Sequence, residues 1–332
     1  MVYSQTGFQK GRVEKMNYQW YPGHMTKAKR AMLEDIKLVD LVIELVDARI
    51  PLSSKNPDID SLARGKARIL LLNKADLADD EKSRLWMKYY EDQGIHAALV
   101  NSSSSGTLRR IRPLIDQACA EKTERDRKRG ILNRPVRAMI CGIPNVGKST
   151  FINSFAGRAA AKTGNRPGVT KGKQWISLNK KVELLDTPGI LWPKFEDPHV
   201  GEKLAMTGAI RDEILPGTDL AGKLILLLEQ LYPDALRNRY FRLPGTEGEE
   251  PDVSGKTNGP AYAGAVPDGM LAGSEHDRHT GEILEAIARS RGCIRSDGAS
   301  DPDRAAALLI DDFRKAKLGK ITLEIPPDTI YY

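Results

Sequence analysis

The chain has 332 residues, of which 40% are hydrophobic and 29% charged, and its formal net charge is +7. This length can bury a sizeable core and favours two domains over one. The longest apolar stretches, such as Leu38 to Val46, are too short and too interrupted by charge to span a bilayer, which excludes a membrane-spanning protein. The N-terminus lacks the apolar run of a secretory signal, and the three cysteines, Cys119, Cys141 and Cys293, lack the spacing of a zinc site or a disulfide framework. We therefore expect a cytoplasmic protein with reduced thiols.

Strand-like runs alternate with helical patterns through the first part of the chain. Alternation of this kind predicts a mostly parallel sheet flanked by helices, in which ligands bind at the loops that follow the carboxyl ends of the strands. The expected strands are Leu41 to Val46, Arg68 to Leu72, Ala97 to Val100, Val136 to Cys141 and Lys181 to Leu185.

The last third of the sequence predicts helices alone. Leucines at helical spacing follow Pro216-Gly217-Thr218, which we expect to begin the first helix. A second helix is expected from Gly281 to Ser290, and a third begins with Asp301-Pro302, an N-cap followed by a proline at the first helical position. An extended segment, Ile321 to Ile325, then ends this small all-helical domain.

A composition change interrupts the helical part. Residues 244–280 are rich in Gly, Pro, Asp and Glu and have little to bury, which predicts a disordered insertion. We divide the chain into an N-terminal extension at 1–17, an α/β domain at 18–207 and a helical domain at 208–332.

The segment Gly142 to Ser149 reads Gly-Ile-Pro-Asn-Val-Gly-Lys-Ser, between an expected strand and an expected helix, as in a phosphate-binding loop. Its glycines let the backbone wrap closely around phosphates, and the helix N-terminus adds a positive dipole. Lys148 would reach the β- and γ-phosphates and act in catalysis. The loop residues expected to contact the nucleotide are Asn145, Val146, Gly147, Lys148, Ser149 and Thr150.

A magnesium site is expected beside this loop. Ser149 would supply a hydroxyl to Mg²⁺, and Asp186, which follows a hydrophobic strand, would hold the metal directly or through water. Thr170 would bind the metal and sense the γ-phosphate as a catalytic switch residue. The amide of Gly189 would report the γ-phosphate to a second switch.

Asn73-Lys74-Ala75-Asp76 follows an expected strand and predicts a guanine-reading loop. One carboxylate can accept from both N1–H and the exocyclic amine of guanine, donors that adenine does not present in that arrangement, and Asp76 fits this role. Asn73 would brace the loops, and the stem of Lys74 would lie against the base. The backbone around Ser102 and Ser103 would donate to the guanine O6.

The order of these motifs is unusual, because the guanine reader precedes the phosphate loop, which is followed by Gly168-Val169-Thr170 and Asp186-Thr187-Pro188-Gly189. In an ordinary Ras-like GTPase the phosphate loop opens the domain and the base reader comes late. We therefore predict that the α/β domain is a circularly permuted P-loop GTPase domain.

Two features of the sequence leave alternatives open. Ile190 follows the last motif where a water-orienting Gln would be expected, so catalysis needs another group. His24, in the segment Trp20 to Met25, can orient water or accept a proton, and from chemistry alone it can equally be a structural histidine at a helix entry. A run from Lys122 to Arg137 holds seven basic residues, which suits either a solvated helix end or a phosphate-contacting patch.

With these motifs located, the sequence closely resembles the bacterial ribosome biogenesis GTPase A family. The resemblance extends from about Tyr18 to Ile325, without the insertion. It rests on the segments Trp20 to Met25, Asp47-Ala48-Arg49-Ile50-Pro51, Asn73 to Asp76, Gly142 to Thr150, Gly168 to Lys171, Asp186 to Trp192, Thr207-Gly208-Ala209-Ile210 and Asp311 to Ile325.

The resemblance implies a GTP-hydrolysing factor for a late step of large-subunit (50S) maturation, in which both domains contact ribosomal RNA. It implies that His24 is catalytic and that Asn145 helps to bind a K⁺ ion, whose charge would replace that of an arginine finger. We expect a monomer that binds GTP or GDP with Mg²⁺, hydrolyses GTP slowly alone and is stimulated by the large subunit and K⁺. The alternatives are a GTP-controlled RNA-binding checkpoint, in which hydrolysis only resets docking, and a GTPase that acts on another RNA.

The sequence departs from the family pattern in two places. The insertion at 244–280 puts RNA contacts by that part of the helical domain in doubt. The four serines Ser102 to Ser105 change little, because backbone amides do the work in that loop.

Overall fold

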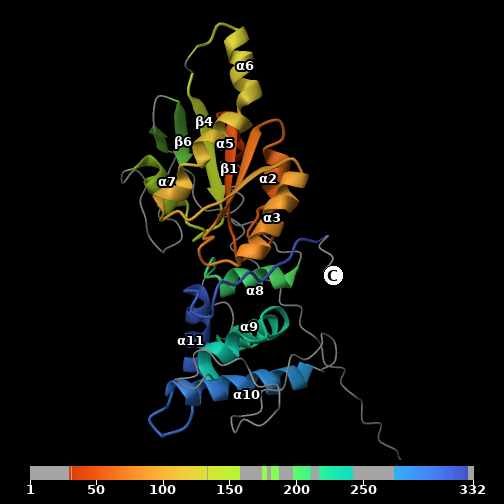
Figure 1. The fold of residues 1–332 in the computed structure, drawn as a ribbon, viewed down its shortest axis with the longest axis vertical. Coiled ribbons are helices and arrows are strands. Elements are labelled where there is room, and N and C mark those ends of the chain that lie inside the picture. The colour runs from red at the N-terminus through yellow and green to blue at the C-terminus, as the bar shows by residue number, and fades with distance from the viewer. Residues whose placement is uncertain are drawn as a thin grey trace, which may run out of the picture.

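In a computed structural model of this protein, one β-sheet flanked by helices forms one half of the molecule, and a group of helices forms the other (Figure 1). The structure describes residues 30, 32–132, 134–157, 174–177, 181–186, 197–210, 217–241 and 273–327. Six strands among these residues form one sheet in the order β3-β2-β1-β4-β6-β5. Their bounds are β1 Leu41–Asp47, β2 Ala67–Asn73, β3 His96–Leu99, β4 Val136–Gly142, β5 Gln174–Ser177 and β6 Val182–Asp186.

Every neighbouring pair of strands is parallel except β5 and β6, which are antiparallel. The five strands expected from the sequence are therefore confirmed, and β5 is an addition at the edge of the sheet. Counting from β4 and returning to β1 after β6 restores the motif order of an unpermuted GTPase, so the permuted fold is also confirmed.

Both faces of the sheet are buried because helices cover each of them. Leu41, Ile43 and Leu45 of β1 belong to one apolar cluster with residues of α5 (Ile111–Ala118) and α7 (Lys148–Ala156). Val42 and Val46 point to the other face, where Trp86 and Tyr90 of α3 (Asp80–Asp92) pack. Three further helices of this domain are α2 Pro57–Leu62, α4 Ser105–Leu108 and α6 Ala120–Lys128.

The helical domain lies beyond the carboxyl ends of β1 and β2, at the opposite end of the molecule from α6 (Figure 1). Leu224 and Leu228 of α9 pack in one core with Leu309 and Phe313 of α11. The helix α8 also contacts α9 and α11, although it precedes the boundary expected at residue 208. The elements are α8 Pro198–Met206, α9 Gly217–Leu231, the single-turn π-helix η2 Arg237–Phe241, α10 Gly273–Arg291 and α11 Pro302–Arg314.

The helix starts agree with the sequence in two of three cases. The helix α9 begins at Gly217, and Asp301 caps α11 by accepting from the backbone N–H of Arg304 at 3.0 Å. The helix α10 begins at Gly273, inside the expected insertion and before the expected start at Gly281. The prediction was wrong here because the first two turns of α10 are polar and carry no apolar spacing that would signal a helix. The rest of that insertion and the extension at 1–17 lie outside the described residues.

The segment Ile321 to Ile325 forms no strand and lies against the α/β domain. The backbone N–H of Ile321 donates to Leu77 O at 3.2 Å, and that of Leu323 donates to Arg49 O at 2.8 Å. The three cysteines are buried and free, as expected, and burial raises the pKa of the Cys119 thiol to about 11. None of the described helices combines the length and apolar character needed to cross a membrane.

Candidate nucleotide site

The loop between β4 and α7 has the backbone of a phosphate cradle. Gly142, the last residue of β4, has φ +148°, and a Cβ atom there would lie 2.5 Å from Leu45 O. Gly147 precedes α7 with φ +101°. Because both glycines adopt backbone angles that suit residues without a side chain, the loop can turn tightly and aim the N-terminus of α7 at a ligand.

Lys148 lies inside this loop. Its side chain is buried, and Nζ donates to Gly142 O at 3.0 Å and to Ile143 O at 2.9 Å. Ser149 and Thr150 follow in the first turn of α7. The ammonium is therefore held where a bound phosphate chain would meet both it and the helix N-terminus.

Asn73 joins three loops through one amide side chain. It is 2% exposed, and its Nδ2 donates to Val146 O of the phosphate loop at 2.7 Å. Its Oδ1 accepts from the backbone N–H of Ser102 at 3.1 Å and from Ser102 Oγ at 2.7 Å. A Cβ atom on Gly147 would lie 2.5 Å from Asn73 Nδ2, so the glycine also makes room for this contact. The base-reading and phosphate loops are therefore assembled against each other.

The serines that were expected to face guanine have other partners here. The backbone N–H of Ser102 donates to Asn73 Oδ1, and that of Ser103 donates to Asn101 Oδ1 at 2.8 Å. Ser102 thus positions Asn73 instead of presenting a free donor. Asp76 is exposed, so its side chain is accessible to a ligand.

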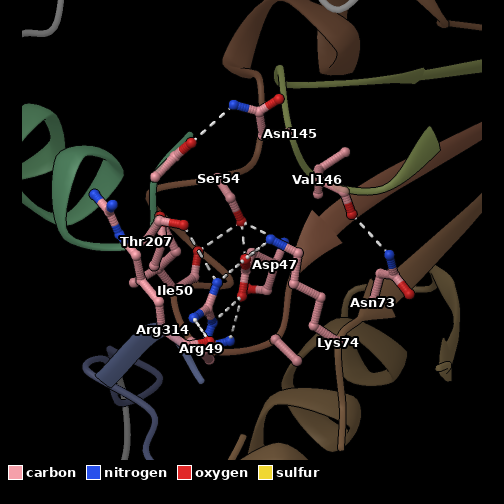
Figure 2. Close-up of polar contacts among 12 residues, drawn as sticks. Asp47, Arg49, Ile50, Ser54, Asn73, Lys74, Asn145, Val146, Thr207 and Arg314 are labelled. Carbon is pink, nitrogen blue, oxygen red and sulfur yellow. Dashed lines mark hydrogen bonds and ion pairs between the residues drawn. The ribbon is translucent and has the colours of Figure 1, made fainter. Parts of the chain in front are cut away.

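Lys74 connects the base-reading loop to a buried carboxylate. It has φ +59°, and its Nζ lies 2.9 Å from Asp47 Oδ2. Asp47 is 2% exposed and also accepts from Arg49 Nε at 2.9 Å and Nη2 at 2.8 Å (Figure 2). Although burial alone would raise it, the neighbouring Arg49 and Lys74 cations hold the pKa of Asp47 well below its usual range.

Arg49 carries this network into the helical domain. Its guanidinium donates to Thr207 O at 3.5 Å and to Arg314 O at 3.4 Å, and it lies 5.4 Å from the centre of the Phe313 ring. Arg314 in turn donates to Ala205 O at 2.7 Å and Met206 O at 3.0 Å, which are carbonyls at the end of α8. No role for Arg49 or Arg314 could be predicted from the sequence, because most of their partners are backbone atoms far away in the chain.

Asn145 makes a second connection between the domains. It has φ +56°, and its Nδ2 donates to Gly208 O at 2.9 Å (Figure 2). Within the described part of the chain, its Oδ1 accepts no hydrogen bond. The atom that would bind a cation is thus distinct from the atom that holds the segment after α8.

Three expected site residues, His24, Thr170 and Gly189, lie outside the described residues. Asp186 ends β6, and its backbone pairs with Ile140, two residues before Gly142. The sheet therefore brings Asp186 to the same edge as Ser149. Carboxylate and hydroxyl oxygens are hard donors that suit Mg²⁺, so this donor set fits the expected metal.

Comparison with known proteins finds GTPases, which agrees with the phosphate loop described above. A family model described as "50S ribosome-binding GTPase" matches residues 137–232. Ribosome biogenesis GTPase A of Bacillus cereus is 42% identical over 313 residues, which cover 94% of this chain and 95% of that protein. The chain belongs to the ribosome biogenesis GTPase A family.

Other members of the family support the same fold. Ribosome biogenesis GTPase A of Thermotoga maritima is 30% identical over 93% of this chain and 95% of its own length. The crystal structure of GNP-bound YlqF from T. maritima covers 91% of this chain and 100% of that one, with 25% identity and a TM-score of 0.59. The family model begins at residue 137, in β4, because permutation places the base-reading motif of this GTPase upstream of its phosphate loop.

Proposed function

We propose that this member of the ribosome biogenesis GTPase A family hydrolyses GTP at a late step of 50S subunit maturation in the cytoplasm. It binds the pre-50S particle and its ribosomal RNA in the GTP state and leaves after hydrolysis. The names of its relatives support the ribosomal part of this proposal. The observation that carries the nucleotide part is Asn73, which locks the Asn-Lys-Ala-Asp loop to the phosphate loop at 2.7 Å.

Each site residue has a role in this proposal. Asp76 reads guanine, and Lys148 with the amides of the loop from Asn145 to Thr150 binds the phosphates. Ser149, Thr170 and Asp186 hold Mg²⁺, which supplies positive charge to the phosphates when it is bound. Asn145 binds K⁺ through Oδ1, and His24 orients the attacking water.

The helical domain would respond to the nucleotide through the connection between the domains. Contacts of Thr170 and Gly189 with the γ-phosphate would order the chain that leads into α8. The end of α8 is already held from the nucleotide side by Asn145 and Arg49. A change at either contact would therefore change how α8 and its neighbours are presented to RNA.

The test is GTP turnover in K⁺ and in Na⁺, with and without purified large subunits, for the parent, His24→Ala and His199→Ala. His199 is exposed on α8, so His199→Ala controls for the loss of an imidazole. We expect subunits and K⁺ to stimulate the parent and His199→Ala, and His24→Ala to lose stimulation while it still binds GTP. Lack of stimulation of the parent by subunits would contradict the ribosomal proposal.

The second candidate is a checkpoint in which GTP occupancy controls docking and hydrolysis only resets it. The direct contacts of Arg49 and Asn145 with the α8 segment favour it, because they link the nucleotide loops to the helical domain. A variant that binds GTP without hydrolysing it separates the two readings. Under the checkpoint, subunits would mature in its presence, whereas they would stall if hydrolysis drives the step.

A further inference from the structure

The helix α6 differs from the other helices of the GTPase domain because it has no buried residue. It projects beyond the sheet at the end of the molecule farthest from α9–α11 (Figure 1). The turn that follows exposes Ile131 and Leu132, whose relative exposures are 43% and 72%. We name α6 and this turn, up to Arg134, the basic arm. Because its helix buries no side chain in the core, core packing does not explain why the basic arm has this structure.

The direction of the arm is fixed at both of its ends. At its base, Lys122 lies 3.5 Å from Asp40 and 3.1 Å from Asp126, and Arg134 lies 3.2 Å from Asp40. At its tip, Gly130 has φ +74°, and the N–H groups of Gly130 and Ile131 donate to Arg127 O and Asp126 O. This pair of bonds is the Schellman motif, which ends a helix in a defined turn.

At the base of the arm, Lys122 and Arg134 neutralise the carboxylates of Asp40 and Asp126. Three other cations of the arm have no carboxylate partner in the described part of the chain. Arg125, Arg127 and Arg129 are exposed and form no ion pair with a described residue. Among the described residues, the side chain of Arg125 donates only to Glu121 O in its own helix, at 3.4 Å. Cations in a last helical turn stabilise the helix dipole, but three unpaired guanidinium groups exceed what one helix end needs.

A hollow of about 650 Å³ lies between the arm and the sheet. Arg125, Arg129 and Arg134 line it from the arm, and Lys66, Arg68 and His96 line it from the sheet side, near the amino ends of β2 and β3. Three carboxylates, Asp40, Glu121 and Asp126, also line it, and two of them, Asp40 and Asp126, pair with Lys122. This edge of the sheet is opposite the edge that carries the nucleotide loops. The hollow is therefore separate from the GTP site, and its volume lies within the range of small-molecule pockets, about 300–1,000 Å³.

We propose that the basic arm and its hollow bind the phosphodiester backbone of RNA, with one nucleotide seated in the hollow. The inference rests on the proposed function for the identity of the partner. Guanidinium groups bind phosphate oxygens in pairs of hydrogen bonds, and Arg125 and Arg129 lie one turn apart beside the hollow. An acidic protein fits less well, because protein interfaces have an apolar core with few charges, whereas nucleic-acid interfaces are polar and strongly basic.

The test compares the double variant Arg125→Ala/Arg129→Ala with Arg84→Ala/Lys88→Ala. Arg84 and Lys88 are exposed on α3 and also lie one turn apart, so both variants lose two surface cations from the same domain. Full-length proteins are titrated with a 23S ribosomal RNA transcript at several KCl concentrations. GTP affinity and thermal unfolding are measured in parallel. Because Lys122 and Arg134 are unchanged, both variants should unfold and bind GTP like the parent.

We expect the arm variant to bind RNA about tenfold more weakly and to lose about two units of the slope of log K against log salt, one for each phosphate contact. The α3 variant should keep both values. Equal RNA binding by the arm variant and the parent, or an equal loss in the α3 variant, would overturn the proposal. So would a loss of binding to whole subunits without a loss of binding to the naked transcript, which would indicate an acidic protein partner.

Failure of the proposed function would give a different result. If the unaltered protein binds neither the transcript nor purified large subunits, the ribosomal assignment itself is overturned. If the parent binds both and the arm variant binds as well as the parent, only the assignment of this surface is overturned.

Discussion

Asp47 forms ion pairs in two directions, with Lys74 of the base-reading loop and with Arg49, which reaches the helical domain. A buried carboxylate between two cations is fully paired only while both partners stay in place. The position of Lys74 beside the guanine reader is therefore coupled, through Asp47, to the helix ends at Thr207 and Arg314.

We predict that Asp47→Asn lowers the free energy of unfolding by about 3–5 kcal/mol at neutral pH, because Arg49 would stay buried without a counter-charge. The folded-state pKa of Asp47 is depressed, so its stabilising effect is present above the unfolded pKa of about 4 and is lost only as pH falls toward the folded value. The loss should thus persist from pH 8 to pH 5. Urea unfolding across this range measures it.

Asp60→Asn is the control for this measurement. Asp60 also pairs with cations, Lys55 and Arg68, but its side chain is 50% exposed. We expect a loss of no more than about 1 kcal/mol, as for other exposed ion pairs. A similar loss for both variants would contradict the special position of Asp47.

At the scale of one element, α7 has a glycine with positive φ at each end, and only the first contacts another loop. A Cβ atom on Gly147 would meet Asn73 Nδ2 at 2.5 Å, whereas one on Gly157, with φ +67°, would meet nothing within 4 Å. We predict that Gly147→Ala weakens GTP binding about tenfold or more, since it pushes the phosphate loop away from the base reader. Titration with a fluorescent GTP analogue measures this.

Gly157→Ala should cost about 1–2 kcal/mol of stability from backbone strain and leave GTP affinity unchanged. If both variants bind GTP equally well, the contact between Asn73 and the phosphate loop does not support nucleotide binding.

Long, apolar or well-capped elements could be predicted from the sequence, and the others could not. The strands β1, β2 and β4 are nearly continuous apolar runs, and Asp301-Pro302 marks the start of α11. The strand β5 was missed because only Trp175 and Ile176 of its four residues are apolar, whereas the equally short β3 lies in the apolar run Ala97 to Val100. The first turns of α10 were missed because Ser274 to Thr280 are polar.

Within the candidate site, the placement of Asn73 and Lys148 in loops next to each other could be predicted, because a motif follows a strand at each position. The role of Arg49 was not, because its carbonyl partner at Arg314 is 265 residues away and leaves no local pattern. The same holds for the arm, since sequence alone did not separate a solvated helix end from a projecting surface with a hollow beside it.

At the scale of the whole molecule, one carboxylate near the end of the described chain holds three regions together. Glu324 is 6% exposed and accepts from the backbone N–H groups of Leu52 at 2.7 Å and Ser53 at 3.2 Å. It also pairs with Lys203 of α8 at 3.2 Å. The backbone carbonyl of the same residue accepts from Trp86 Nε1 at 3.1 Å.

We predict that Glu324→Ala lowers the free energy of unfolding by about 2–4 kcal/mol, because it leaves the N–H groups of Leu52 and the buried Ser53, and a partly buried ammonium, without their partner. Glu282→Ala is the control, since Glu282 pairs with Arg278 on the surface of α10 and should change stability by no more than about 0.5 kcal/mol. Thermal and urea unfolding report both. An unchanged midpoint for Glu324→Ala would show that the Glu324 side chain is not needed for stability.

The contacts of Glu324 also determine when the protein can finish folding during its synthesis. The loop at Leu52 emerges early, but its partner Glu324 is made 272 residues later. A nascent chain can pair β1 with β2 at once, whereas the carbonyl that binds Trp86 is made 238 residues after Trp86, and the carboxylate that caps this loop comes from the same late residue. Contacts so distant in sequence form slowly. The newly made protein therefore gains the stability that these contacts supply only after Glu324 has been synthesised and has returned to the Leu52 loop.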